Sequence, residues 1–147
     1  MILQACSGLK KTIKSTQAYA MALQQGTVQA NENETSQVTP STTISIYVQA
    51  NSFDLQFDTC WINNKAYVVK MQKINHPLEL GTDEVSEQKI TVIPDEKGCM
   101  YQLQVGPLSV EGKELAGATV RIRLSHKQRQ AYQTTAPIRI IKDFDRL

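Results

Sequence analysis

The residues best suited to chemistry lie apart from one another along the chain. His76 and His126 are isolated, and none of the three cysteines sits in a C-x-x-C pair, whereas a structural zinc site needs four ligands at close spacing. Asp54 and Asp58 would share the outer face of one strand, about 13 Å apart at ~3.3 Å per residue, which is too far for the paired carboxylates of a glycosidase. The sequence therefore predicts that the protein is not an enzyme and needs neither a metal nor a cofactor.

Cys60 and Cys99 are candidates for a disulfide. A bridge between them would close a loop of about 39 residues and stabilise the fold by roughly 3–4 kcal/mol. The strand pattern opposes it, because Cys99 shares its alternation with inward Tyr101, whereas Cys60 shares its alternation with outward Asp58. Two cysteines on opposite faces can bridge only if a bulge shifts one of them, and both outcomes stay open.

Basic residues gather towards the C-terminal end, where Arg121, Arg123, Lys127 and Arg129 follow one another closely. Such a ladder could bind phosphate, lipid head groups or an acidic protein. The alternative is a solvated face that protects a sheet edge from pairing. Tyr47 falls on the polar side of its strand and is a further candidate for contact with a partner.

Trp61 is the candidate for a ligand platform. With Phe57 and Phe53 on the same side of a predicted strand, it could line a sugar-binding face. Strict alternation also gives these three rings an interior to pack in, and this second interpretation is favoured.

The chain opens with the residues "MILQACSG". Leu3, Ala5 and Cys6 resemble the lipobox of bacterial lipoproteins, in which the cysteine becomes the lipidated first residue. The resemblance implies that Cys6 anchors the protein to a membrane. A signal peptide also needs a charged start and 7–15 apolar residues, and only Met1-Ile2-Leu3 precede the motif. We therefore expect that the start codon was assigned too late or that the chain is a fragment.

Composition sets the remaining limits. The formal net charge of +2 argues against a dedicated nucleic-acid binder. Residues 41–118 carry six Lys against ten Asp and Glu, whereas residues 119–147 carry seven Lys and Arg against two Asp. We expect the acidic middle and the basic end to attract one another across adjacent strands. No run of eighteen apolar residues predicts a membrane-spanning helix.

The N-terminal part, residues 1–42, is interpreted as a truncated lipoprotein signal, a weak helix and a flexible tether. Apolar residues at helical spacing predict the helix over 8–25. Residues 26–42, "GTVQANENETSQVTPST", have almost nothing to bury and predict a linker.

From Thr43 to Leu147 the pattern changes to a period of two, which predicts a single β domain. Seven strands are expected, over about 43–49, 53–62, 65–73, 89–93, 101–105, 118–125 and 131–142, and Pro137 should place the last of them at an edge or a bulge. This spacing predicts an all-β fold, an antiparallel two-sheet sandwich of immunoglobulin-like type, with a small barrel as the alternative.

The segments "FDTCWINNKAYVVKMQKINHPLELGTDE" and "KITVIPDEKGCMYQLQVGP" resemble small cell-envelope lipoproteins of Bacteroidota that have no assigned activity. The resemblance covers about half of the chain and implies a periplasm-facing β-sandwich. We expect a non-enzymatic module that is bound to the membrane through Cys6 and contacts other envelope proteins, and no nucleic acid. The alternative is a module that binds a glycan or another small ligand through an aromatic platform.

Overall fold

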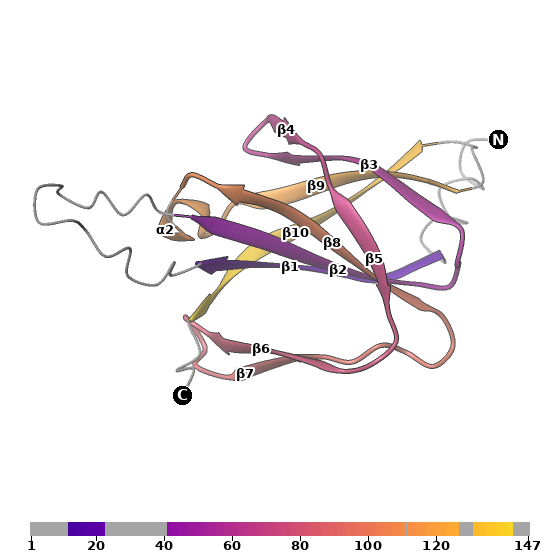
Figure 1. Ribbon diagram of the computed structural model, residues 1–147, viewed down its shortest axis with the longest axis horizontal. Helices are drawn as coiled ribbons and strands as arrows, with labels where there is room; N and C mark the ends of the chain where they lie inside the picture. Colours follow the sequence, from indigo (N-terminus) through magenta and orange to yellow (C-terminus); the bar gives the residue numbers. More distant parts are fainter. Residues whose placement is uncertain (1–11, 23–40, 111, 127–130, 143–147) are drawn as a thin grey trace, which may run out of the picture.

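The described part of the chain is almost all β-structure, which confirms the predicted all-β class. The structure, a computed structural model, describes residues 12–22, 41–110, 112–126 and 131–142 (Figure 1). The strands are β1 (Ile13–Ala22), β2 (Thr42–Ala50), β3 (Leu55–Ile62), β4 (Lys65–Tyr67), β5 (Lys70–Ile74), β6 (Leu78–Asp83), β7 (Lys89–Val92), β8 (Cys99–Leu108), β9 (Thr119–His126) and β10 (Ala131–Lys142). A single turn of helix, α2 (Gly112–Leu115), precedes β9.

All ten strands belong to one strongly curled, mixed sheet. The main path runs β4-β3-β9-β10-β1-β2-β8-β5, and a hairpin of β6 and β7 pairs with β10 beside this path. The strands at the two ends of the path, β4 and β5, are separated in the chain only by Val68 and Val69, so the sheet must curl until its ends approach each other. The predicted antiparallel two-sheet, immunoglobulin-like sandwich is therefore wrong.

Strand β10 explains how a single sheet can enclose an interior. Its first half pairs with β9 antiparallel as far as Pro137, opposite Thr119, and its second half pairs with β1 parallel from Ile138, opposite Ala18. Proline has no backbone N–H for a ladder, and here it stands where the strand changes partner. Pro137 thus marks the change of pairing partner inside the sheet rather than the predicted edge or bulge.

Residues 13–22 form strand β1, not the predicted helix over 8–25. The strand lies between β2 and β10, and from Ala18 to Met21 both of its faces are covered: Ala18 and Ala20 point into one hydrophobic cluster, Tyr19 and Met21 into another. A stretch of strand that is buried on both sides shows no polar-apolar alternation, which is why this part of the sequence resembles a thin helical stripe. The first strand of the sheet thus lies where the weak helix was predicted, while residues 1–11 and 23–40 lie outside the described residues.

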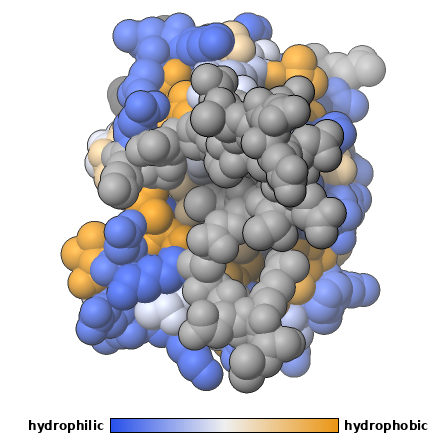
Figure 2. Space-filling view, turned by 60° about the vertical axis from the view of Figure 1, so that its left-hand side comes forward, coloured by the Kyte–Doolittle hydropathy of each residue, from blue (hydrophilic) through white to orange (hydrophobic). Residues whose placement is uncertain are grey.

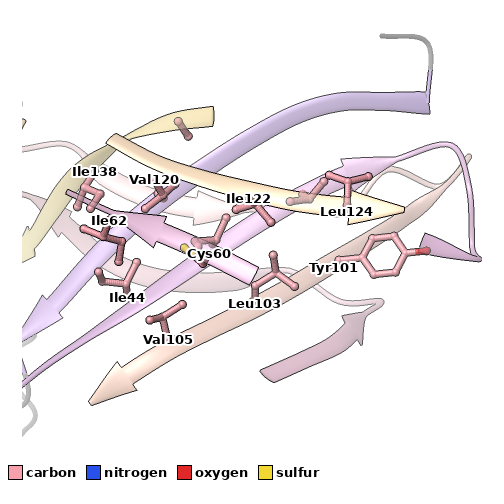
Figure 3. Packing of buried hydrophobic residues seen from close by; sticks show 14 of the residues in the cluster. Ile44, Cys60, Ile62, Tyr101, Leu103, Val105, Val120, Ile122, Leu124 and Ile138 are labelled. Atoms are coloured by element: carbon pink, nitrogen blue, oxygen red, sulfur yellow. The ribbon is translucent and has the colours of Figure 1, made fainter. Parts of the chain in front are cut away.

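The main core fills the inside of the curl (Figure 3). Strands β2, β3, β8, β9 and β10 all contribute alternate aliphatic side chains, and α2 adds Leu115. The fully buried members include Ile44, Ile46, Leu103, Ile122 and Leu124. The alternate apolar residues of β2, β8 and β9, which follow the period of two in the sequence, point into this core.

A second, smaller core covers the outer face of β1, β2 and β8. Leu80 and Val92 of the β6–β7 hairpin pack there with Tyr19, Tyr47 and Met100. The sequence did not predict β6, since residues 75–87 look like a polar connection. It also joined residues 65–73 into one strand, whereas β4 and β5 lie at opposite ends of the sheet path.

Candidate partner-binding face

A bulge in β3 decides which side chains reach the outer surface of the sheet. Phe57 pairs with Leu124 and Thr59 pairs with Arg123, so Asp58 is the extra residue. A bulge reverses the alternation of everything that follows it. Trp61 therefore points outward and is only half-buried, which corrects its favoured assignment to the core.

Phe53 and Phe57 do not join Trp61 in an aromatic row. Phe53 precedes β3 and is 58% exposed, while Phe57 packs against the main core with its ring centroid 5.1 Å from that of Tyr101. The ring-ring contacts among the described residues are Phe57–Tyr101 and Tyr19–Tyr47, and neither involves Trp61. The predicted aromatic platform is thus reduced to one indole.

The outer face of β3, β9 and β10 places two arginines beside that indole. Trp61 lies directly opposite Arg121, and Thr59 lies directly opposite Arg123. On the other side of β9, Thr135 pairs with Arg121 and Gln133 pairs with Arg123. Directly opposed residues of antiparallel strands point to the same face. We call these residues the outer arginine face: Thr59, Trp61, Arg121, Arg123, Gln133 and Thr135.

Arg121 is held against Trp61 by a cation–π contact, with the guanidinium carbon 4.7 Å from the ring centroid. At an exposed site such a contact contributes about 0.5–1 kcal/mol, enough to favour one orientation of a long side chain. Within the described parts of the chain, neither Arg121 nor Arg123 forms an ion pair with a carboxylate. The face therefore presents two exposed positive charges, one of which is oriented.

The other residues predicted to contact a partner do not extend this face as the structure describes it. Tyr47 is buried at 2% exposure, and its hydroxyl accepts a hydrogen bond from the Gln102 amide at 3.0 Å. The polar face of β2 is covered by the β6–β7 hairpin, so Tyr47 has no surface to offer. Lys127 and Arg129 lie outside the described residues, as does the lipidation candidate Cys6.

Cys60 and Cys99 are both free and buried, so of the two outcomes that the sequence left open the structure shows the unbridged one. The bulge does turn Cys60 inward, and Cys60 then lies near the middle of the core beside Leu103 (Figure 3). Cys99 precedes Tyr101 by two residues in β8, and Tyr101 lies at the far end of the core (Figure 3). Burial raises the pKa of the Cys60 thiol to about 11, which suppresses its thiolate at neutral pH. Cys60 is therefore a packing residue and not a nucleophile.

A buried ion pair that the sequence did not reveal fixes the β6–β7 hairpin. The Asp83 carboxylate accepts hydrogen bonds from Ser86 Oγ at 2.7 Å and from an Arg139 guanidinium nitrogen at 2.6 Å. Burial acts to raise the pKa of Asp83, but these hydrogen bonds and the charge of Arg139 outweigh it and hold the pKa below its usual value. With Glu87–Lys142 at 3.6 Å, this pair joins the acidic middle to the basic end as the charge distribution predicted.

Figure 2 shows hydrophilic residues around most of the visible outline, with hydrophobic residues gathered in a few places between them. The described residues contain no group of three or more His, Cys, Asp or Glu side chains arranged to hold a metal ion. No helix in the described part of the chain is long and apolar enough to cross a membrane. No protein-family model, no curated protein and no solved structure matches this chain.

Proposed function

We propose that the protein is a non-enzymatic cell-envelope lipoprotein that binds other envelope proteins through the outer arginine face. One observation carries the proposal: Arg121 and Arg123 lie exposed beside the half-buried Trp61, and no carboxylate in the described residues neutralises them. Arginine and tryptophan are the residues most enriched where protein-protein interfaces concentrate their binding energy. The face thus has the composition of an interface centre.

The geometry favours a protein partner over a glycan. A sugar-binding platform stacks the ligand on an open aromatic ring, whereas the Trp61 ring is already in contact with the Arg121 guanidinium. The second ring that would extend the platform, Phe57, is turned inward to the core. A glycan remains the alternative occupant, and binding on a glycan array that is lost in Trp61→Ala would select it.

The lipid anchor rests on the "LQACSG" sequence, and strand β1 shortens the tether that it implies. Only six residues separate Cys6 from Ile13, where β1 begins. Fully extended chain spans about 3.6 Å per residue, so β1 would begin no more than about 25 Å from the anchored cysteine. The proposal therefore keeps the domain close to the membrane and restricts it to partners there. Labelling with radioactive palmitate, lost in Cys6→Ser, tests the anchor.

Photo-crosslinking in intact cells tests the binding face. A photoreactive amino acid at Thr135, which is exposed on the face, should give a protein adduct that disappears in the double variant Arg121→Glu/Arg123→Glu. The same probe at Thr91, exposed on β7, is the matched control and should give no such adduct. A Thr135 adduct that is absent, or that survives the charge reversal, would remove this function.

A further inference from the structure

We infer that the outer arginine face recognises an extended, acidic protein segment whose carboxylates stand two residues apart. The inference rests on the proposed function and specifies the chemistry of its partner. Three observations support it: the spacing of the two arginines, the orientation of one of them, and the neutral polar side chains around both.

The spacing follows from the strand. Arg121 and Arg123 are alternate residues of β9 and point to the same face. A strand rises about 3.3 Å per residue, so the two side chains leave the sheet about 6.6 Å apart. In an extended partner, side chains at positions i and i+2 repeat at the same interval and on the same side. Two carboxylates at i and i+2 can therefore meet both guanidinium groups without bending either chain.

The contact between Arg121 and Trp61 prepares one of these pairings. The guanidinium carbon lies 4.7 Å from the centroid of the indole ring, and a guanidinium carries its N–H groups in its own plane, where two of them can form parallel hydrogen bonds to one carboxylate. Lysine carries the same charge but has no planar fork and stacks less well on an aromatic face. The arrangement thus selects a carboxylate by geometry as well as by charge.

The neighbouring side chains suit a peptide. Thr59 and Gln133 flank Arg123, and Thr135 lies opposite Arg121, so the positions that pair directly with the arginines hold neutral hydrogen-bonding groups or Trp61. These groups can bond to the backbone or polar side chains of a partner and do not repel its acids. The described part of the face offers two cations, and two cations hold a polyanion weakly, because each neutralised phosphate contributes only about one unit to the slope of the logarithm of affinity against the logarithm of salt concentration. A short acidic protein segment is therefore favoured over a membrane surface or a nucleic acid.

Intrinsic fluorescence gives a direct assay, because Trp61 is the only tryptophan in the chain. Two peptides of identical composition and without aromatic residues would be titrated, one with glutamates at i and i+2 and one with glutamates at i and i+3, which in an extended chain point to opposite sides. We expect the first to bind at least about tenfold more tightly. Arg121→Lys and Arg123→Ala should each weaken its binding about tenfold, whereas Lys89→Ala on the exposed part of β7 should leave it unchanged.

Equal affinity for the two peptides would overturn the inference. So would an Arg121→Lys variant that binds the first peptide as tightly as the parent protein and has the same unfolding temperature. Arginine-dependent binding to phosphatidylglycerol vesicles without a preference between the peptides would overturn it in favour of a lipid surface. The crosslink from Thr135 separates the two proposals. If it persists with its arginine dependence while neither peptide binds, the acidic segment is excluded and the partner-binding function stands.

Discussion

Replacing Asp83 tests how the β6–β7 hairpin is held against the sheet. The Asp83 side chain is 3% exposed and accepts hydrogen bonds from Ser86 and Arg139. Asp83→Asn keeps the size of the side chain and removes its charge. Hydrogen bonds to a charged group contribute about 1.5–3 kcal/mol, and water recovers part of this because Arg139 is 46% exposed. We expect the free energy of unfolding at pH 7 to fall by about 1–3 kcal/mol.

The pH dependence of this loss gives the stricter criterion. The pKa of Asp83 is lower in the folded protein than its unfolded value of 3.8, because the hydrogen bonds and the charge of Arg139 outweigh the opposing effect of burial. The stabilisation is therefore present above pH 3.8 and is lost as the pH falls through the lower folded pKa. Urea denaturation at pH 7 and at about pH 2.5 should show that the difference in free energy of unfolding between Asp83→Asn and the parent protein becomes smaller in acid.

Glu87→Gln is the matched control. The Glu87 carboxylate lies 3.6 Å from the Lys142 ammonium, and both side chains are well exposed, so we expect a change of about 0.5 kcal/mol or less. Equal losses from Asp83→Asn and Glu87→Gln would refute the reasoning. So would an Asp83→Asn deficit that is as large in acid as at neutral pH.

Three further substitutions or probes test the core. Tyr101→Phe removes a hydroxyl that accepts from a backbone N–H at 3.2 Å and donates to a backbone carbonyl at 2.7 Å, so urea denaturation should show a loss of about 1–3 kcal/mol; a loss under about 0.5 kcal/mol would contradict it. Cys60, with its pKa raised to about 11, should resist iodoacetamide until urea unfolds the chain, and mass spectrometry showing native alkylation would disprove this. Gly98→Ala would place a methyl group 2.4 Å from the Ala50 carbonyl oxygen and should cost about 1–3 kcal/mol in thermal unfolding; an unchanged transition would show that the loop yields freely.

The sequence predicts well wherever one strand keeps an unbroken alternation. In β9, Val120, Ile122 and Leu124 are fully buried, while Arg121 and Arg123 are exposed, as their pattern indicated. The reason is local: side chains of a strand alternate whatever its neighbours are. The two arginines that β9 supplies to the outer arginine face were therefore visible in the sequence.

The part of the face that β3 supplies depends on a bulge that leaves no trace in composition. The extra residue Asp58 turns Trp61 outward and Cys60 inward, and only the pairing of β3 with β9 reveals where the extra residue lies. The helix predicted over 8–25 was wrong for a related reason. The strand that forms there, β1, depends on β10 and the β6–β7 hairpin, which lie more than fifty residues away in the chain. Pairing partners distant in sequence decided both errors.

The contrast between the two outer faces of the described sheet bears on where the proposed partner would bind. Strands β1, β2 and β8 place Tyr19, Tyr47 and Met100 on their outer side, where Leu80 and Val92 of the β6–β7 hairpin bury them. Strand β9 instead turns two arginines outward, and covering these with apolar side chains would leave buried, unpaired charges at a cost of several kcal/mol. A segment that covers them must bring its own carboxylates. The same physical rule that lets the hairpin pack onto one part of the sheet thus supports the proposal that any partner of the outer arginine face is acidic.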